Sequence, residues 1–151
     1  MKRHNWTIAH RMSLATFAGA ILVGAYWIAF LGGWLGETDP AVRSFEGAFP
    51  LADSVLVAAL VLASRGLIKG RSTGPFFLVC AAGMTFYLGL LDVLFYWRAG
   101  RYVPFGAAAG VQLLINGLCL GGGAIGLRFG WRLWGRREQV DSKAIERKLA
   151  A

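Results

Sequence analysis

Hydrophobic residues in this chain gather in four long runs that are separated by short polar segments. The runs cover about residues 12–35, 48–68, 75–97 and 105–130. Each is close to the roughly 20 residues that a helix needs to cross the hydrocarbon core of a bilayer. None shows the alternation of apolar and polar residues that is typical of a membrane β-barrel. The pattern therefore predicts an all-α integral membrane protein with four transmembrane helices in a bundle.

The composition agrees with this prediction. Of the 151 residues, 56% are hydrophobic, and the mean hydropathy is +0.53, whereas ordinary soluble domains are about 45–50% apolar on a comparable count. The connections between the runs are too short to form a separate soluble domain. We therefore expect one transmembrane domain over residues 1–135, followed by a basic cytoplasmic tail over residues 136–151.

The basic residues predict the orientation of the chain. Of the 16 Lys and Arg, 13 lie in the N-terminal segment, the second connection and the C-terminal region, and 3 lie in the first and third connections. Cytoplasmic segments of membrane proteins carry the excess of Lys and Arg. This distribution predicts a bacterial-type inner (plasma) membrane protein with both termini in the cytoplasm (N-in/C-in). Since the net charge of +8 flanks the apolar runs, we expect no nucleic-acid partner.

Two aspartates lie inside apolar runs, Asp53 in the second and Asp92 in the third. A carboxylate within a transmembrane segment is costly and usually serves a function or pairs with another group. Each lies about five residues inside the outer end of its run, which corresponds to a depth of about 7–8 Å. We therefore predict that the two carboxylates meet at similar heights on adjacent antiparallel helices.

Further polar side chains are expected at the same end of the bundle. Gln112 and Asn116 are one turn apart and share a face of the fourth run. Glu46 precedes Asp53 by seven residues and shares its face if the helix starts that early, and Tyr96 follows Asp92 by one turn. The predicted ligand-binding set is Asp53, Asp92, Gln112, Asn116, Tyr96 and Glu46.

Such a set predicts an outward-facing polar pocket that binds a small lipophilic or cationic ligand. Two neighbouring carboxylates in a weakly polar site cannot both ionise cheaply, so a shared proton could support proton-coupled transport. Two structural alternatives remain open for the aspartates. Either could pair with an arginine and hold helices together, the candidates being Arg43, Arg98 and Arg101. Asp53 could also be stabilised by the positive end of its own helix dipole.

Two other functions also remain open. Glycines at a spacing of four let helix backbones approach closely in lipid, so the fourth run could pack within the bundle, form a homodimer or dock an accessory subunit onto a larger membrane complex. The glycines concerned are Gly106, Gly110, Gly117 and Gly121. The carboxylates could instead act as acid and base in a membrane enzyme with a lipid-like substrate. We favour a protein that is not an enzyme, because the sequence has neither GxxxxGK[ST] nor GxSxG.

The sequence gives no basis for a cofactor. The only histidines, His4 and His10, precede the first run, so paired intramembrane histidines cannot hold a haem and a His-rich metal centre is not expected. We therefore assign no catalytic and no metal-binding residue. The expected partners are membrane lipid and a small-molecule ligand.

Overall fold

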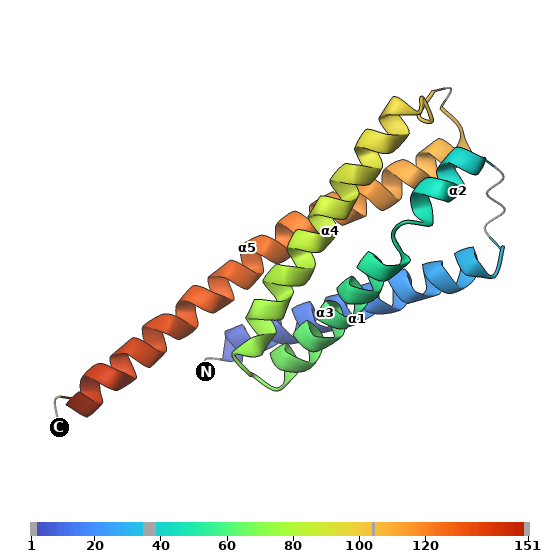
Figure 1. Ribbon diagram of the computed structural model, residues 1–151. Coiled ribbons are helices and arrows are strands. Elements are labelled where there is room, and N and C mark those ends of the chain that lie inside the picture. Colours follow the sequence, from blue (N-terminus) through green and yellow to red (C-terminus); the bar gives the residue numbers. More distant parts are fainter. Residues whose placement is uncertain (1–2, 35–38, 104, 150–151) are drawn as a thin grey trace. The chain divides into compact units, whose positions relative to one another are not determined.

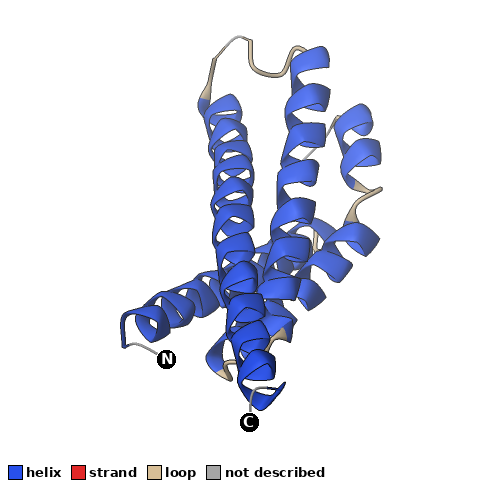
Figure 2. Ribbon diagram, turned by 90° about the vertical axis from the view of Figure 1, so that its left-hand side faces the viewer, coloured by secondary structure: helices blue, strands red, loops and turns tan. Residues whose placement is uncertain are grey.

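The computed structural model describes residues 3–34, 39–103 and 105–149, with side chains for residues 7–34, 39–103, 105–107, 109–135 and 146. These residues form helices and no strand (Figure 2). The helices are α1 (Arg3–Leu31), α2 (Pro40–Glu46), α3 (Pro50–Ile68), α4 (Thr73–Arg98) and α5 (Ala107–Leu149).

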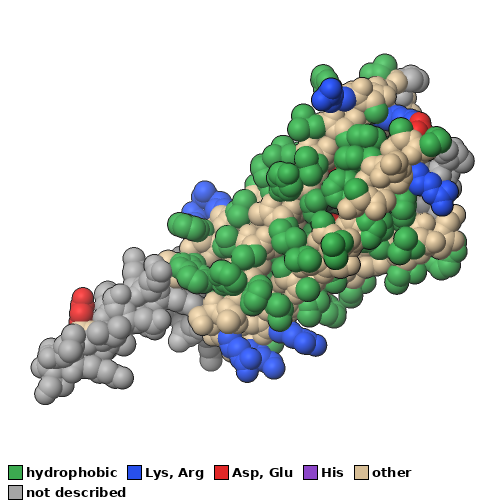
Figure 3. All heavy atoms as spheres, in the orientation of Figure 1, with side chains coloured by type: hydrophobic (Ala, Val, Ile, Leu, Met, Phe, Trp, Pro, Cys, Tyr) green, Lys and Arg blue, Asp and Glu red, His purple; other side chains and the backbone are tan. Residues whose placement is uncertain are grey.

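Four of these helices are long and apolar enough to cross a membrane, so the prediction of four long apolar helices is confirmed. The segments that meet this condition are Thr7–Leu31, Pro50–Ile68, Thr73–Arg98 and Ala109–Gly135. Hydrophobic side chains cover much of the face in view, where Lys and Arg side chains are few (Figure 3). Leu22, Leu31 and Leu51 illustrate this exposure, at 68%, 72% and 80%. By length and composition this is an integral membrane protein.

The short helix α2 lies in the first connection and was not predicted. The Asp39 carboxylate caps it by accepting hydrogen bonds from the backbone N–H of Ala41 at 2.8 Å and of Val42 at 3.4 Å. Pro40 occupies the first helical position, where a missing N–H costs little. Because α2 ends at Glu46 and α3 begins at Pro50, the helix of Asp53 does not start early enough to include Glu46, and the condition for the two residues to share a face is not met.

Three of the helices end in the same way. Gly33, Gly70 and Gly100 follow α1, α3 and α4 and have φ angles of 73°, 61° and 65°. After each glycine, the next N–H bonds to the carbonyl five residues earlier at 2.8–2.9 Å. This left-handed glycine termination satisfies backbone carbonyls that the helix itself leaves unpaired.

The last helix is longer than predicted. α5 comprises 43 residues and its backbone stays helical through residue 149, across the expected boundary between residues 135 and 136. A helix of this length extends about 65 Å, more than twice the thickness of a hydrocarbon core. Hydropathy identifies only its apolar part, whereas the polar part is rich in Glu, Lys and Arg, which favour helix without being hydrophobic.

Contacts along the chain divide it into two compact units, Met1–Phe77 and Leu78–Ala151, and each is described by itself. In the first unit α1 packs along α3 (Figure 1). Ser13 and Ser64 join the two helices at buried positions. The Ser13 hydroxyl donates to the Ser64 carbonyl at 2.9 Å, and the two hydroxyls are also 2.9 Å apart. Polar groups between these apolar helices are thus satisfied within the protein, as a membrane interior requires.

The turn between α3 and α4 depends on two glycines. A Cβ atom added to Gly66 would lie 2.5 Å from the Gly74 Cα atom, and one added to Gly74 would lie 2.5 Å from the backbone nitrogen of Leu67. Both distances are far below van der Waals contact, so the close approach of the two backbones requires glycine at both positions.

In the second unit, glycines of α5 pack against α4. An added Cβ atom would lie 2.8 Å from the Phe86 Cβ atom at Gly123, 2.8 Å from the Ala82 Cβ atom at Gly126, and 2.6 Å from Val79 Cγ2 at Gly130. Such small residues let two helices approach closely in lipid. The glycine-rich fourth run therefore does serve packing between helices of one chain.

The glycines predicted for a homodimer or partner interface are a different set. Gly106, Gly117 and Gly121 have no atom within 4 Å of an added Cβ, and Gly110 has Phe105 of the preceding connection at 3.7 Å. The tight contact with α4 is therefore made by Gly123, Gly126 and Gly130, and not by the glycines predicted for the interface.

Candidate functional site

The carboxylate of Asp53 is held by an aromatic residue of α1. Asp53 lies in the first turn of α3 and is partly buried. The Trp27 indole N–H donates to the Asp53 Oδ2 atom at 2.7 Å, a distance typical of a charge-assisted hydrogen bond. Because α3 begins at Pro50, Asp53 lies only about 5 Å inside its helix, less than the sequence predicted. Its place in the first turn agrees with stabilisation of the carboxylate by the helix dipole.

Glu46 is held in a similar way by the neighbouring residue. The Tyr26 hydroxyl donates to the Glu46 Oε2 atom at 2.5 Å. Consecutive aromatic residues of α1, Tyr26 and Trp27, therefore bind carboxylates on two different elements, α2 and α3. Their rings also pack edge to face, with centroids 5.3 Å apart. This arrangement attaches α2 to α1 near the end of the apolar segment.

Two of the predicted site residues meet across α4 and α5. The Gln112 side-chain amide donates to the Asp92 Oδ2 atom at 3.4 Å, which is long for a hydrogen bond of this kind. Asp92 lies about 9 Å inside the end of α4 at Arg98. The two residues that the sequence places at one end of the bundle are thus joined by an interhelical contact.

Asn116 is the most unusual polar residue of the second unit. It is 1% exposed, and its Nδ2 group donates to the Tyr102 hydroxyl at 2.8 Å. Its Oδ1 atom is buried and has no hydrogen-bond partner among the described residues. Leaving a buried acceptor unpaired costs about 1–3 kcal/mol. A group of this kind calls for an explanation, such as a bound water or ligand.

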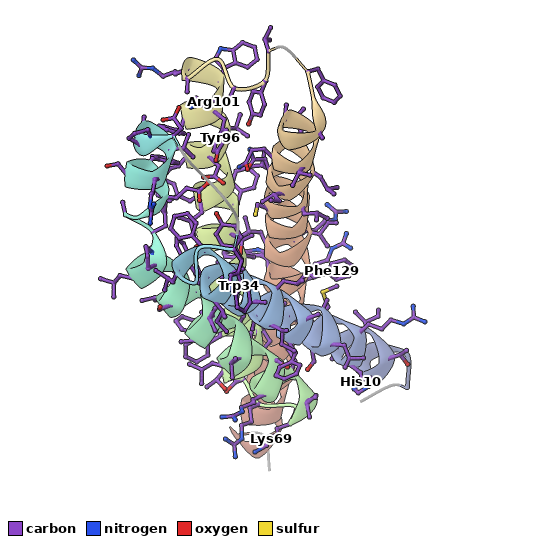
Figure 4. All side chains as sticks on the ribbon, turned by 90° about the vertical axis from the view of Figure 1, so that its right-hand side faces the viewer. His10, Trp34, Lys69, Tyr96, Arg101 and Phe129 are labelled. Carbon is purple, nitrogen blue, oxygen red and sulfur yellow. The ribbon has the colours of Figure 1, made fainter. Side chains whose placement is uncertain are left out.

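The ring of Tyr102, whose hydroxyl accepts from this amide, lies near the ring of Tyr96. Their centroids are 6.2 Å apart, with an angle of 31° between the ring planes, and Tyr96 is 9% exposed. Figure 4 shows Tyr96 and Arg101 close to the end of α4. The end of the second unit therefore combines a carboxylate, two amides and two phenol rings within a few helical turns.

The predicted site residues are thus divided between two groups. Asp92, Gln112, Asn116 and Tyr96 belong to the second unit, whereas Asp53 and Glu46 belong to the first. That Asp53 and Asp92 share one pocket stays a prediction. An open hollow of about 470 Å³ lies on α4 and is lined by Leu94, Phe95, Arg98 and Ala99, so none of the predicted ligand-binding residues lines it.

Three aromatic residues take part in these contacts although the sequence analysis did not select them. Tyr26, Trp27 and Tyr102 each carry one polar hydrogen on a large apolar ring, and such residues usually find a partner when they are buried. A search for aromatic donors at the same depth as the carboxylates would have selected Tyr26 and Trp27. Tyr102 lies in a connection whose path hydropathy does not predict.

The chemistry of the site is that of hydrogen bonding and charge. Within the ranges that the structure describes, no three His, Cys, Asp or Glu residues come together to hold a metal ion. Cys80 and Cys119 are free thiols. No family model, no curated protein and no solved structure matches the chain, so the functional argument depends on the contacts above.

Proposed function

We propose that this chain is an integral protein of a bacterial-type inner membrane with both termini in the cytoplasm. We further propose that the outer ends of α4 and α5 bind a small lipophilic ligand through its ammonium group. The distribution of Lys and Arg supports the orientation, and four apolar helices support the membrane location. The four-helix bundle predicted from the sequence stays part of this proposal.

The buried Oδ1 atom of Asn116 is the single observation that carries the binding proposal. It accepts no hydrogen bond from the described residues, so a donor from outside the protein would relieve its penalty. The Asp92 carboxylate accepts a hydrogen bond from Gln112, which lies one turn from Asn116 on α5. It therefore adds negative charge to the same end of the helix pair. A ligand that donates hydrogen bonds and carries positive charge matches both groups.

The roles of the neighbouring residues follow from this match. Asp92 would supply charge, Asn116 would orient one N–H group, and Gln112 would hold the Asp92 carboxylate in place. The faces of Tyr96 and Tyr102 carry negative electrostatic potential, which attracts a cation close to a ring. The participation of Asp53 and Glu46, and proton-coupled movement of the ligand, stay predictions of the sequence.

Thermal unfolding of the detergent-solubilised protein tests the proposal, with hexylammonium as the probe. The unfolding temperature of the wild type should rise with hexylammonium in a saturable way, because a ligand that binds only the folded state stabilises it. Tetraethylammonium, which has charge but no N–H, should raise the unfolding temperature less than hexylammonium does. Hexanol, which has an O–H donor but no charge to match Asp92, should also raise it less.

Three variants complete this experiment. Asn116→Leu and Asp92→Asn should each lose the response to hexylammonium, whereas the control Ser54→Ala, an exposed hydroxyl of α3, should keep it. A full response in Asn116→Leu, or an equal response of the wild type to hexanol, would contradict the proposal.

A second candidate function has one specific observation in its favour. Gly117 and Gly121 lie one turn apart on α5 and have open space around an added Cβ, so a partner helix could approach this face closely. The chain would then be an accessory subunit or a homodimer. Light scattering of Gly117→Leu/Gly121→Leu should show a smaller assembly than the wild type, whereas an unchanged assembly would contradict this candidate.

A further inference from the structure

Two arginines of α5 lie where this helix passes from the apolar segment into polar surroundings. Arg128 and Arg132 both fall within the apolar segment Ala109–Gly135, and both are exposed. Neither has a hydrogen-bond or ion-pair partner among the residues that the structure describes. Charged side chains within a transmembrane segment are rare and normally pair with another group. A partner from outside the described residues would satisfy these charges.

The position of the two arginines along α5 indicates what kind of molecule could be their partner. The segment Ala109–Gly135 has 27 residues and extends about 40 Å, which matches a bilayer with its headgroup regions rather than the 30 Å hydrocarbon core. Arg128 lies about 28 Å from Ala109 along the axis, close to the far boundary of that core, and Arg132 lies about 6 Å beyond it. The two guanidinium groups can therefore reach the level of the lipid phosphates.

Two tryptophans, one between the arginines in sequence and one after them, also suit the level of the lipid headgroups. Trp131 and Trp134 are 73% and 38% exposed, and indole rings prefer the interface between headgroups and hydrocarbon. The long stems of Arg128 and Arg132 can cover apolar surface while their charged ends extend toward phosphate.

The spacing of the two arginines suits a single anion. Side chains four residues apart on a helix are neighbours, with Cβ atoms about 5–6 Å apart. Two guanidinium groups on one face can thus converge on one phosphate, and the planar fork of arginine matches phosphate oxygens in pairs. A lysine pair would keep the charge but would lose this paired geometry.

We propose that Arg128 and Arg132 form a binding site for the phosphate of an anionic phospholipid at the end of α5 that follows its apolar segment. The site lies at the opposite end of that segment from Gln112 and Asn116, so it does not depend on the ammonium site. Its source of phosphate is the lipid of the surrounding leaflet, because both arginines lie at the level of the headgroups.

Native mass spectrometry of the delipidated full-length protein tests this site. The protein is mixed with phosphatidylglycerol or phosphatidylcholine, and bound lipid is counted. The wild type should bind phosphatidylglycerol at least about tenfold more tightly than phosphatidylcholine. Arg128→Gln/Arg132→Gln should lose most of this preference. Arg128→Lys/Arg132→Lys should keep part of it, which also shows that the altered helix still folds.

The control variant removes the same charge at another place. Lys69→Gln/Arg71→Gln, in the connection between α3 and α4, should retain the preference for phosphatidylglycerol. Equal losses in the two Gln variants would overturn the proposal, because they would show a general effect of charge. Equal binding of both lipids would also overturn it. Displacement of phosphatidylglycerol by an excess of inorganic phosphate would assign the site to free phosphate instead.

Discussion

Because the amide oxygen of Asn116 is buried and unpaired, removing it should affect stability differently from removing an ordinary, hydrogen-bonded interior group. We consider replacing both members of the hydrogen bond at once, in Asn116→Leu/Tyr102→Phe. Leucine is close to asparagine in size, and phenylalanine keeps the ring that packs on Tyr96. The change removes the buried acceptor that has no partner and the 2.8 Å bond between Asn116 and Tyr102.

The expected magnitude follows from these two contributions. Removing the unpaired oxygen should recover about 1–3 kcal/mol, whereas losing one hydrogen bond between helices in a membrane protein costs about 0.6 kcal/mol on average. The ligand-free double variant should therefore be more stable than the wild type by about 1 kcal/mol, while hexylammonium should no longer stabilise it. Tyr102→Phe alone leaves the whole amide without a described partner and should be destabilised by about 1–3 kcal/mol.

The free energy of unfolding in bicelles, measured by steric trapping, checks these signs. A matched control is Ser13→Ala/Ser64→Ala, which removes a buried pair whose hydroxyls bond to each other. This control should lose roughly 1 kcal/mol, because no unpaired group is relieved. If Asn116→Leu/Tyr102→Phe loses about as much as the control, the Asn116 oxygen is satisfied in the protein and the reasoning is refuted.

Three further predictions concern packing and the Asp53 contact. Gly123→Ala should destabilise the protein by about 1–3 kcal/mol, because the added Cβ would lie 2.8 Å from an atom of α4. Gly121→Ala, where nothing lies within 4 Å, should instead stabilise the protein by up to about 1 kcal/mol. Equal unfolding free energies of the two variants would contradict the described α4–α5 contact. Gly74→Ala should prevent the close α3–α4 turn, which a lower yield of folded protein in gel filtration would reveal and a normal yield would exclude. Trp27→Phe should cost about 1.5–3 kcal/mol, because it removes a donor from a carboxylate. Asp53→Asn should cost less, since it keeps an acceptor oxygen for the indole; the reverse order in thermal unfolding would show that the Trp27 bond is not the main contribution.

The sequence predicts the long helices well because hydropathy over some 20 residues is a strong signal. It also places Asp92 and Gln112 at the same end of their helices, since depth along two antiparallel helices depends only on a regular rise per residue. It misses α2, where a local cap at Asp39 starts a helix too short for any periodic pattern. Hydropathy does not indicate that α5 continues unbroken beyond its apolar part, because helix propensity in a charged segment is independent of hydropathy.

The hydrogen-bond partners of Asp53 and Glu46 depend on single polar hydrogens of aromatic side chains, which a hydropathy scale does not record. Trp27 and Tyr26 read as ordinary apolar residues of a span, yet each has one polar hydrogen that a buried ring must satisfy. The state of the Asn116 oxygen depends on the path of the connection that carries Tyr102. Sequence reasoning could therefore place Asn116 at the polar end of α5, but it could not show that half of its amide lacks a partner.

Nuclear magnetic resonance of the Asn116 side chain is the most direct test of the central claim. In ¹⁵N-labelled protein, the amide signal is assigned by its loss in Asn116→Leu and followed during titration with hexylammonium. The account predicts a saturable shift of this signal with hexylammonium and a smaller shift with the same concentration of hexanol, which has a donor but no charge. A signal that does not move while hexylammonium binds, or that moves equally with hexanol, would contradict it.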